Sequence, residues 1–469
     1  MTFLAIDQGT TSTRGLIVDE KGHTDVIFSK SHRQIYPHSQ WVEHDPEELL
    51  THILACIDLG RERGVRAVGI ANQGESCLAW DAKTGKALSP VIVWQDARTQ
   101  AKIEHLRADG FEATVLQRAR LPLDPYFSAS KLGWILENIP AATECAAQGR
   151  LRLGTTDAFF RDRLTGDFAT DLATASRTAL LNIADGVWDP DLCALFGVPI
   201  EALPRITACN GRFGDVDGLP LTASIVDQQA ALYGNCAANV GDAKVTLGTG
   251  AFVLALSGDT IKSNSGGALP TVAWQEDGHS PIYALEGGVY AAAAAVNWAK
   301  GIGLFTDFDE LMRFEESSML DRGLAFVPAL AGLACPYWDR NAKGSWLGLT
   351  LDTTQANMMQ AVLEGIAYRV AQVLAAMNSQ ISLNSSLRVD GGMSANPWFC
   401  QLLADVTGKE VLAGTETELT AIGVARLAAR CMGEDIVPAF DLHTTAPRKN
   451  AAVHPDRFAT ACKITQQWG

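Results

Sequence analysis

The stretch "FLAIDQGTTSTRGLIVD", Phe3 to Asp19, indicates how this chain begins to fold. Two runs with alternating apolar residues flank a turn rich in Gly, Thr and Ser, a pattern typical of a β-hairpin. The segment "DPEELLTHILACIDLG", Asp45 to Gly60, has apolar residues at helical spacing and a Pro-Glu-Glu start, which predicts a helix. Two strands followed by a helix predict an α/β layered domain.

The stretch "AVGIANQGESCLAWD", Ala67 to Asp81, follows this helix and has an unusual turn. Apolar strand-like runs flank the polar sequence Asn-Gln-Gly-Glu-Ser. A tight turn explains a Gly and an Asn, but it does not need a Gln and a Glu as well. The turn is therefore a candidate binding site.

The opening pattern occurs a second time in "DAKVTLGTGAFVLALSG", Asp242 to Gly258, where a strand meets a Gly-Thr-Gly turn and a second strand returns. Before it, the strand-like "TASIV" runs into a helical segment at Asp227. After it come a long apolar helix, Thr353 to Met377, and a strand, Gly-Gly turn and helix from Leu387 to Gly408. The repeat predicts two halves of similar build, residues 1–236 and 237–469.

The bulk properties fit a folded cytoplasmic protein. With 469 residues, 47% apolar, the chain is long enough for two large domains. A net charge of −15 argues against nucleic acid or an anionic membrane as a partner. The ten cysteines show no Cys-x-x-Cys spacing, so we expect reduced thiols and no zinc site. The N-terminus has no signal-peptide pattern.

Three turns at strand ends have the composition of phosphate-binding loops. They are "DQGTTSTR" after the first strand, "LGTG" near residue 248 and "DGGMSAN" near residue 391. Glycines allow the backbone to approach a ligand closely, hydroxyls donate to phosphate oxygens, and Arg14 offers a planar fork. Asp7 is a hard oxygen ligand of the kind Mg²⁺ prefers. Neither a P-loop nor a Rossmann fingerprint is present. Because the three turns are distributed over two similar halves, we expect nucleotide binding in a cleft between the halves.

Each of these residues also has a structural interpretation. Asp7 and Asp227 could cap turns or helices, and Arg14 could be an exposed strand residue. Asn396 could be the N-cap of a helix that starts at Pro397, which is compatible with contact to a nucleotide. The glycines could serve the turns alone.

A set of ordered segments resembles the FGGY carbohydrate kinases, and among them the members that phosphorylate glycerol. The segments are "FLAIDQGTTSTRGLIVD", "YPHSQWVEHDPEEL", "DPYFSASKLGWILEN", "DQQAALYG", "TLGTGAFV", "PYWDRNAKGSWLGLTLD" and "RVDGGMSANPWF". They extend from the N-terminus to about residue 433. The resemblance implies two actin-like domains of the ribonuclease H type, with ATP and substrate meeting in the cleft between them, and a homodimer or homotetramer.

The resemblance also assigns roles to residues. Asp227 is expected to be the catalytic base, and Asp7 and Asp227 are expected to hold Mg²⁺. The residues expected to bind ATP are Thr10, Thr11, Ser12, Arg14, Gly248, Thr249, Asn297, Gly392 and Asn396. Those expected to bind a small polyol or sugar are Gly74, Glu75, Trp94, Tyr126, Asp227, Gln228 and Phe252.

Two departures from the family pattern affect specificity and regulation. The polyol-binding turn of the resembling kinases reads Asn-Gln-Arg-Glu, whereas here Gly74 stands in place of the Arg. The resemblance implies glycerol as the substrate, and the missing Arg leaves erythritol, ribulose or xylulose as alternatives. The short "DVDGLPL" segment, Asp215 to Leu221, replaces a loop that binds fructose 1,6-bisphosphate in well-regulated relatives, so we expect no such inhibition. A non-catalytic actin-like nucleotide-binding protein is the alternative of a different class.

Overall fold

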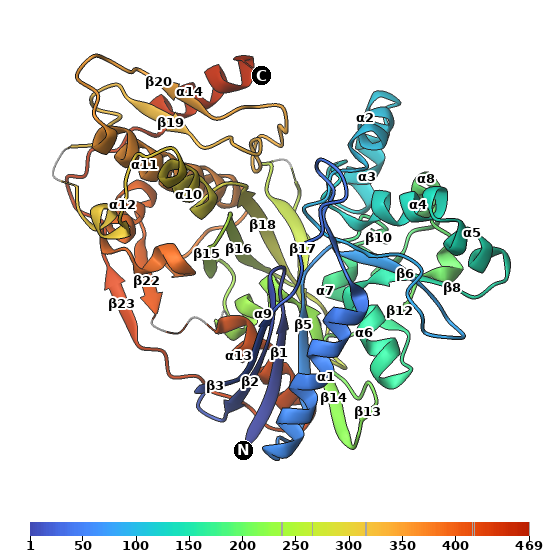
Figure 1. The fold of residues 1–469 in the computed structure, drawn as a ribbon. Coiled ribbons are helices and arrows are strands. Elements are labelled where there is room, and N and C mark those ends of the chain that lie inside the picture. Colours follow the sequence, from blue (N-terminus) through green and yellow to red (C-terminus); the bar gives the residue numbers. More distant parts are fainter. Residues whose placement is uncertain (236–237, 265, 315–316, 415, 417, 469) are drawn as a thin grey trace.

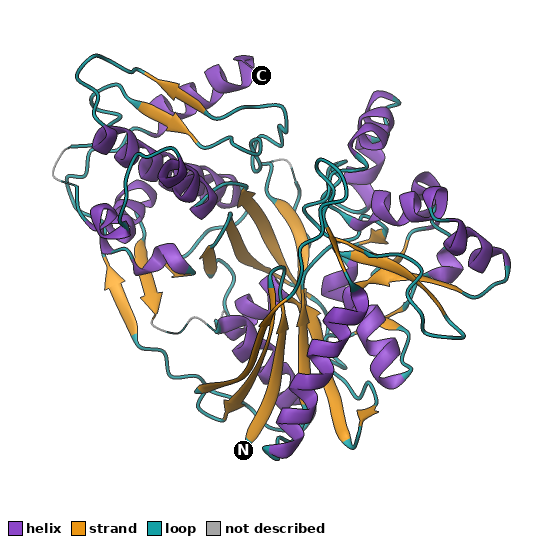
Figure 2. Ribbon diagram, viewed as in Figure 1, coloured by secondary structure: helices purple, strands orange, loops and turns teal. Residues whose placement is uncertain are grey.

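The computed structural model describes residues 1–235, 238–264, 266–314, 317–414, 416 and 418–468. Two large sheets, each flanked by helices, dominate the molecule, and a helix-rich lobe extends from the first of them (Figures 1 and 2). The predicted division between residues 236 and 237 lies outside the described residues. Among the described residues, no helix combines the length and the apolar character that crossing a bilayer requires.

The first sheet has six strands in the order β13-β14-β5-β1-β2-β3. Their bounds are β1 Thr2–Gln8, β2 Ser12–Asp19, β3 Thr24–Ser31, β5 Val68–Asn72, β13 Asp215–Val216 and β14 Leu219–Val226. The β1–β2 pair is the predicted hairpin, and β5 and β14 continue the sheet in parallel with β1. The carboxyl ends of β1, β5 and β14 therefore meet at one edge of the sheet, where ligands bind in open α/β sheets.

The second sheet repeats this plan with seven strands in the order β17-β18-β16-β15-β21-β22-β23. Their bounds are β15 Ala243–Leu247, β16 Ala251–Gly258, β17 Leu269–Trp274, β18 Ile282–Val289, β21 Ser386–Asp390, β22 Glu410–Gly414 and β23 Leu442–Thr445. The β15–β16 hairpin corresponds to β1–β2, and β21 and β22 run parallel to β15 as β5 and β14 do to β1. The internal repeat predicted from the sequence is thus a repeat of topology.

The segment between β5 and β14 adds the lobe on the right of Figure 1. It supplies β7 Val91–Ile92, β6 Cys77–Asp81 and β8 Leu151–Thr155 to a four-stranded sheet in the order β4-β7-β6-β8, whose edge strand β4 Glu43–His44 precedes β5 in the chain. Its helices are α2 Gln100–Ala108, α3 Glu112–Arg118, α4 Ser128–Asn138, α5 Pro140–Ala147, α6 Thr156–Thr165, α7 Leu172–Ala175 and α8 Pro190–Phe196. Because β5 and β6 belong to different sheets, the polar turn between them is a crossover and not a hairpin.

The remaining elements complete the layers. The helices are α1 Pro46–Glu62, α9 Asp227–Gly234, α10 Ala293–Gly301, α11 Gln355–Asn378, α12 Pro397–Thr407, α13 Leu419–Cys431 and α14 Pro455–Trp468. The two-stranded pairs are β9 Ala169–Asp171 with β12 Arg205–Thr207, β10 Leu181–Asn182 with β11 Val187–Trp188, and β19 Ala325–Val327 with β20 Ser345–Leu347. The predicted helices 45–60 and 353–377 are confirmed as α1 and α11 to within two residues at each end.

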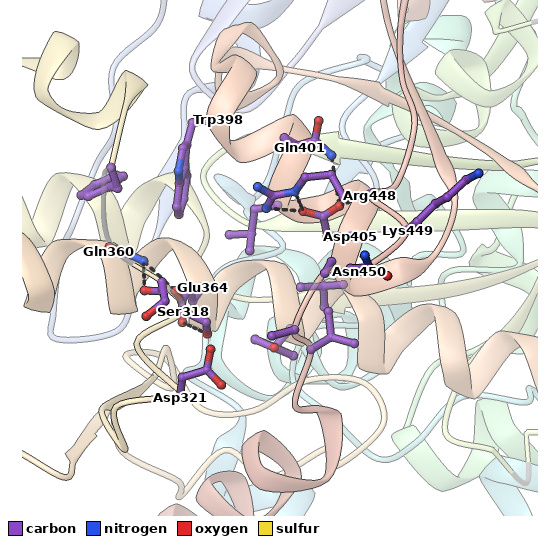
Figure 3. Close-up of a pocket in the computed structure, with 18 residues that line it drawn as sticks. Ser318, Asp321, Gln360, Glu364, Trp398, Gln401, Asp405, Arg448, Lys449 and Asn450 are labelled. Carbon is purple, nitrogen blue, oxygen red and sulfur yellow. Dashed lines mark hydrogen bonds and ion pairs between the residues drawn. The ribbon is translucent and has the colours of Figure 1, made fainter.

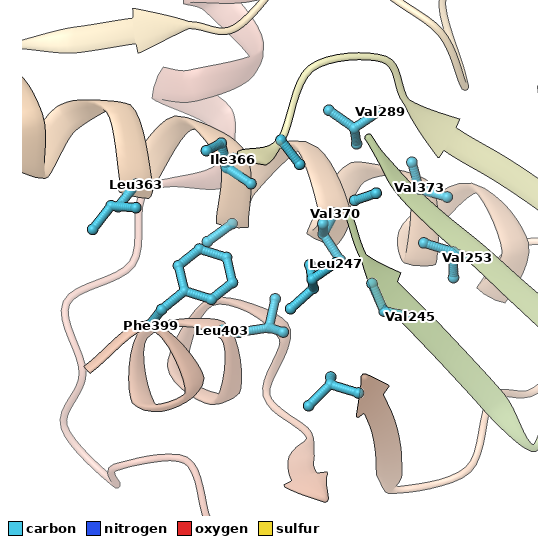
Figure 4. Packing of buried hydrophobic residues seen from close by; sticks show 14 of the residues in the cluster. Val245, Leu247, Val253, Val289, Leu363, Ile366, Val370, Val373, Phe399 and Leu403 are labelled. Atoms are coloured by element: carbon cyan, nitrogen blue, oxygen red, sulfur yellow. The ribbon is translucent and has the colours of Figure 1, made fainter. Parts of the chain in front are cut away.

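The core of the second half shows why α11 is so apolar. Figure 4 shows Ile366, Val370 and Val373 of α11 between the strands and α12. Val245 and Val253 approach from the sheet, and all five side chains are buried. A helix covered on both sides loses the polar face of an ordinary surface helix, which accounts for the long apolar run.

The two halves meet where α9 crosses α13. Although α13 follows β22 of the second half, it packs against β1, β5 and β14 of the first sheet. At the crossing, a Cβ on Gly423 would lie 1.8 Å from the carbonyl oxygen of Ala230, and one on Gly234 would lie 2.0 Å from that of Leu419. The helix backbones therefore touch directly, and only glycine permits this approach.

Candidate active site

A cavity of about 410 Å³ lies between the two halves, at the carboxyl ends of the parallel strands. Eleven of the predicted site residues line it: Thr10, Thr11, Gly74, Glu75, Trp94, Tyr126, Asp227, Gln228, Gly248, Thr249 and Phe252. All the predicted substrate-binding residues are thus in one place. They come from both halves, with Gly248, Thr249 and Phe252 supplied by the β15–β16 turn and β16.

Two carboxylates at strand ends have raised pKa values: Asp227, which lines the cavity, and Asp7 near the end of β1, which is not among the lining residues. Burial raises the pKa of Asp227 to about 7, and the charges of Asp7 and Glu75 add to the effect, while the Gln228 N–H and Lys244 oppose it. Burial also raises the pKa of Asp7 to about 6, with Glu418 adding to the shift and Arg14 opposing it. The negative charge of Asp7 acts on Asp227, and a cation beside the two carboxylates would relieve this repulsion.

Asp227 is placed by the junction of a strand and a helix. It is the first residue of α9, directly after β14, and its Oδ1 accepts the backbone N–H of Gln228 at 2.7 Å. The helix N-terminus and this hydrogen bond both favour the ionised form, against the effect of burial. The carboxyl group is therefore balanced between its two protonation states near neutral pH.

The polar turn between β5 and β6 is held by hydrogen bonds within the protein. Gln73 Nε2 donates to Nδ1 of His44 at 3.2 Å, and Ser76 Oγ donates to Gln73 Oε1 at 3.1 Å. The Ser76 hydroxyl in turn accepts the backbone N–H of Trp94 at 3.1 Å. Gln73 and Ser76 therefore shape the turn and position an aromatic residue of the cavity, which explains why they are polar.

Glu75 has a strained backbone and a fixed carboxylate. Its φ of 55° is in the left-handed region that residues other than glycine rarely adopt. Glu75 Oε1 accepts a hydrogen bond from Nε of Arg177 at 2.7 Å, and Nη2 of Arg177 donates to Oε1 of Glu286 at 2.8 Å. Backbone strain of this kind is typical of functional sites, where the surrounding structure maintains it.

An aromatic wall faces these carboxylates. The rings of Trp94 and Tyr126 meet edge to face with centroids 5.6 Å apart, and those of Trp94 and Phe252 with centroids 6.3 Å apart. The Trp94 Nε1–H donates to the hydroxyl of Thr10 at 2.9 Å. Aromatic faces beside fixed polar groups suit a small polyol, whose C–H groups pack on the rings.

Two turns form the part of the cavity expected to bind phosphate. In the β1–β2 turn, Gly9 N–H donates to Ser12 O at 3.0 Å, and Gln34 Nε2 donates to Thr10 O at 2.8 Å. In the β15–β16 turn, the carbonyls of Gly248 and Thr249 accept the first backbone N–H groups of the α10 segment at 2.9–3.0 Å. The second turn is therefore anchored to a helix N-terminus.

The other predicted site residues lie outside this cavity. Ser12 begins β2, and Arg14 on β2 forms an ion pair with Glu418 at 2.7 Å. Asn297 is exposed on α10. Gly392 begins a 3₁₀ turn, in open space. Their roles in nucleotide binding stay predictions.

Asn396 is the helix N-cap that the sequence suggests. Its Oδ1 accepts the N–H of Phe399 at 3.0 Å, and its Nδ2 donates to the carbonyl of Leu311 at 2.8 Å. The structural interpretation is thus confirmed, and its contact with a nucleotide stays a prediction.

A second cavity, of about 620 Å³, lies beside α11 and α12, as Figure 3 shows. None of the predicted site residues lines it. Its carboxylates are occupied: Glu364 accepts from the N–H of Met319 at 2.9 Å, and Asp405 accepts from Arg448 Nε at 2.8 Å. The raised pKa of Glu364 comes from burial and is opposed by hydrogen bonds, whereas neighbouring carboxylates add to the raised pKa of Asp227 in the cleft.

Sequence reasoning missed Arg177 and Glu286, which line the cleft cavity. Each is a lone charge in an apolar run, "ATASRTALL" and "IYALEGGVY". A lone charge of each sign in such runs is a signal for a buried ion pair. The sequence alone did not indicate that the two would meet, because they are 109 residues apart and in different halves.

Comparison with known proteins agrees with the fold. The N-terminal domain model of the FGGY family of carbohydrate kinases matches residues 2–229, and the C-terminal domain model matches residues 243–432. The chain is 41% identical over 440 residues to glycerol kinase 1 of Pseudomonas aeruginosa, covering 91% of this chain and 89% of that protein. It is also 41% identical over 437 residues to glycerol kinase of Thermus brockianus, covering 90% and 88%.

Solved structures show the same two-domain arrangement. Glycerol kinase of Plasmodium falciparum with ADP superposes with a TM-score of 0.89 at 29% identity, covering 99% of this chain and 96% of that one. A xylulose kinase from Lactobacillus acidophilus superposes with a TM-score of 0.86 at 22% identity, covering 100% of this chain and 96% of that one. At this identity the similarity shows the fold alone. With both halves matched and the cleft built as described, the chain belongs to the FGGY family of carbohydrate kinases, phosphotransferases with an alcohol group as acceptor.

Proposed function

We propose that the chain transfers the γ-phosphoryl group of ATP to a hydroxyl of a small polyol, converting glycerol to glycerol 3-phosphate. The observation that carries this proposal is the cavity in which Asp227, Glu75 and the aromatic wall lie beside two Gly/Thr turns. The relatives that share about 40% of the sequence over most of the chain are glycerol kinases, which supports glycerol over a longer polyol or ketose.

In the proposed reaction, Asp227 accepts the proton of the substrate hydroxyl while its oxygen attacks the γ-phosphorus and ADP leaves. A base with a pKa of about 7 is suited to this task at neutral pH. Glu75 accepts a hydrogen bond from a second hydroxyl, and the aromatic wall packs against the carbon chain. Together these contacts hold the nucleophile in line, which is where most catalysis of phosphoryl transfer arises.

The cleft residues fit a magnesium ion. Asp7 and Asp227 raise the negative charge of one site, and Mg²⁺ is typically held by one or two carboxylates together with water and substrate phosphates. Across the described part of the chain, no group of three or more His, Cys, Asp and Glu side chains forms a metal site of its own. We propose that these two aspartates hold Mg²⁺, which neutralises phosphate charge when bound with ATP.

The remaining parts of the proposal concern nucleotide contacts and cellular context. Thr10, Thr11, Gly248 and Thr249 bind the phosphates, with Ser12 and Arg14 beside them, and Asn297, Gly392 and Asn396 bind the nucleoside end. The protein acts in the cytoplasm as a homodimer or homotetramer, which light scattering coupled to gel filtration tests. The net charge of −15 supports the absence of nucleic acid or an anionic membrane as a partner.

The test is ATP turnover across a panel of acceptors. ADP release is measured with glycerol, erythritol, ribulose, xylulose and no acceptor, with and without Mg²⁺, and the product is identified by ³¹P NMR. We expect glycerol to give the highest kcat/KM and glycerol 3-phosphate as the product. If erythritol or a ketose gives a higher kcat/KM than glycerol, that compound is the substrate instead. If no acceptor is turned over, the result supports the non-catalytic alternative.

A further inference from the structure

The carboxylate of Glu75 is held by one oxygen only. Its Oε1 accepts from Arg177, and its Oε2 has no hydrogen-bond partner in the part of the chain that the structure describes. Glu75 lines the cavity, and its side chain is almost fully buried. Oε2 is therefore the oxygen of this carboxylate that is free to accept a hydrogen bond from a ligand in the cavity.

Two carboxylates and two aromatic rings hold Arg177. Its guanidinium is held between Glu75 and Glu286, and its carbon Cζ lies 5.8 Å and 5.4 Å from the ring centroids of Tyr126 and Phe127. The side chain is 2% exposed. Two charge-assisted hydrogen bonds from one planar group fix both its position and its orientation, which an ammonium group cannot do.

Arg177 also balances the charge of the cavity. Glu75, Glu286 and Asp227 are acids that line it, and Arg177 is the single cationic residue among its described lining residues. Position 74 supplies no cation, since it is a glycine, and a Cβ there would lie 3.0 Å from Cγ2 of Val226. The positive charge that keeps Glu75 in place therefore comes from the loop between α7 and β10.

We propose that Arg177 is the positioning residue of the substrate site, which holds Glu75 so that its Oε2 accepts the hydrogen bond of a polyol hydroxyl. This inference rests on the proposed function. Arg177 acts through Glu75, because Nη1, its third nitrogen, is buried and has no partner among the described residues. The contribution of Glu286 from the second half means that this positioning depends on both halves of the molecule.

A double-mutant cycle tests the proposal. The proteins are wild type, Arg177→Gln, Glu75→Gln and the double variant, with steady-state kinetics for ATP and for the acceptor that wild type prefers. We expect Arg177→Gln to raise KM for the acceptor by ~10–100-fold while KM for ATP and kcat change by less than ~3-fold. In the Glu75→Gln background, Arg177→Gln should raise KM for the acceptor by less than ~3-fold further, because the carboxylate that Arg177 positions is absent. Arg177→Lys should recover part of the loss.

Arg161→Gln is the matched control. Arg161 is also buried, forms an ion pair with Asp167 at 2.5 Å and lies 3.8 Å from the ring centroid of Phe213, but it does not line the cavity. Thermal unfolding and ATP binding confirm that each variant is folded. An equal rise in acceptor KM in both Glu75 backgrounds, or an equal rise in Arg161→Gln, overturns the positioning role. Failure of wild type on the whole acceptor panel overturns the proposed function and is seen before any variant is compared.

Discussion

Burial of Asp227 has opposite consequences for its action as a base and for the stability of the folded protein. As a base it has to be ionised to accept a proton, and a pKa near the working pH gives it the highest basicity compatible with that; burial beside Asp7 and Glu75 raises its pKa to about 7. The same crowding disfavours the ionised form in the folded state. Because the folded pKa lies above that of the unfolded chain, the folded state binds more protons between pH 4 and pH 7, and this contribution to stability is lost as pH rises.

The first prediction is that Asp227→Asn is inactive but more stable. Loss of the base should lower kcat by ~10²–10⁴-fold. Loss of the buried charge should raise Tm by about 2–6 °C at pH 8, and by less at pH 5, where the carboxyl is already protonated. Calorimetry at both pH values measures this, and a variant less stable than wild type at pH 8 contradicts it. For wild type, kcat/KM should rise with pH up to about pH 7 and then level off.

The second prediction concerns Gly74. Placing an Arg there adds a donor to the cavity but requires Val226 to shift by a few tenths of an ångström. We expect Gly74→Arg to lower KM for glycerol by about 3–10-fold and to lower kcat/KM for erythritol, because the donor adds a charge-assisted hydrogen bond while the side chain removes space. Gly74→Ala controls for the Cβ alone. Improved use of erythritol by the Arg variant counts against this view.

Some residues of the cavity could be predicted from the sequence, and others could not. Glu75, Tyr126 and Asp227 lie in contiguous motifs, so the resemblance placed them in the pocket, and the structure brings them to one cavity. Arg177 and Glu286 lie outside such motifs and acquire meaning only when the halves fold against each other. Long-range ion pairs of this kind leave no periodic signal in a single sequence.

At the scale of elements, the close approach of α9 and α13 requires two glycines, Gly234 and Gly423. Gly423 contacts the backbone of Ala230, one turn before the end of the helix that begins at Asp227. The sequence predicted α9 as a helix, but nothing in its pattern indicated that it crosses another helix at backbone distance. Close approach is a property of the pair of helices and not of either one.

The third prediction is that Gly423→Ala forces these helices apart. The added methyl would lie 1.8 Å from the Ala230 oxygen, so we expect a loss of about 1–3 kcal/mol or more of folding free energy. We also expect kcat to fall, because α9 carries Asp227. Gly301→Ala is the control, since Gly301 ends α10 in open space and its replacement should be neutral or slightly stabilising. Chemical denaturation measures the stability of both variants, and steady-state kinetics measures their kcat. Equal stability of Gly423→Ala and Gly301→Ala would contradict the prediction.

The fourth prediction concerns the β13–β14 hairpin. Val216 pairs with Leu219 across a turn of two residues, Asp217 and Gly218, both with positive φ. So short a connection leaves no loop for a bisphosphate ligand. We expect fructose 1,6-bisphosphate at millimolar concentration to leave initial rates unchanged, and strong inhibition in the same assay would refute this.

The elements themselves were largely predictable. The β1–β2 hairpin follows from alternating apolar residues around a Gly/Thr turn, and α1 follows from its Asp45 cap and apolar spacing. The crossover after β5 could not be predicted. The sequence shows that one strand follows another, but it does not show that β5 and β6 belong to different sheets. Its polar residues were noticed, and their partners His44, Trp94 and Arg177 came from the structure.

At the scale of the whole molecule, the site is divided between two similar halves. The first half brings Asp7, Glu75 and Asp227, and the second brings the Gly248–Thr249 turn, Phe252 and Glu286. The repeated strand order could be inferred from the two Gly-containing hairpins. The relative placement of the halves could be inferred only from the family resemblance, since periodicity carries no information on how two domains meet.

The fifth prediction is closure of the cleft on ligands. Binding that uses groups from both halves favours the arrangement in which they approach. We expect the radius of gyration from X-ray scattering to decrease when polyol and a non-hydrolysable ATP analogue are present together, and to change less with either alone. Closure excludes water and limits wasteful hydrolysis of ATP. Superimposable profiles for the free and doubly bound protein contradict the prediction.

The glycine contact between α9 and α13 has a consequence for the assembly of the site. The backbones meet at Gly423 and Gly234, and side chains of both helices pack around this contact in one buried cluster. The place of α9, and with it that of Asp227 at its first position, therefore depends on α13. Because α13 comes from the second half of the sequence, the first half does not by itself fix the position of its own strand-end carboxylate, and the site is complete only when the whole chain has folded.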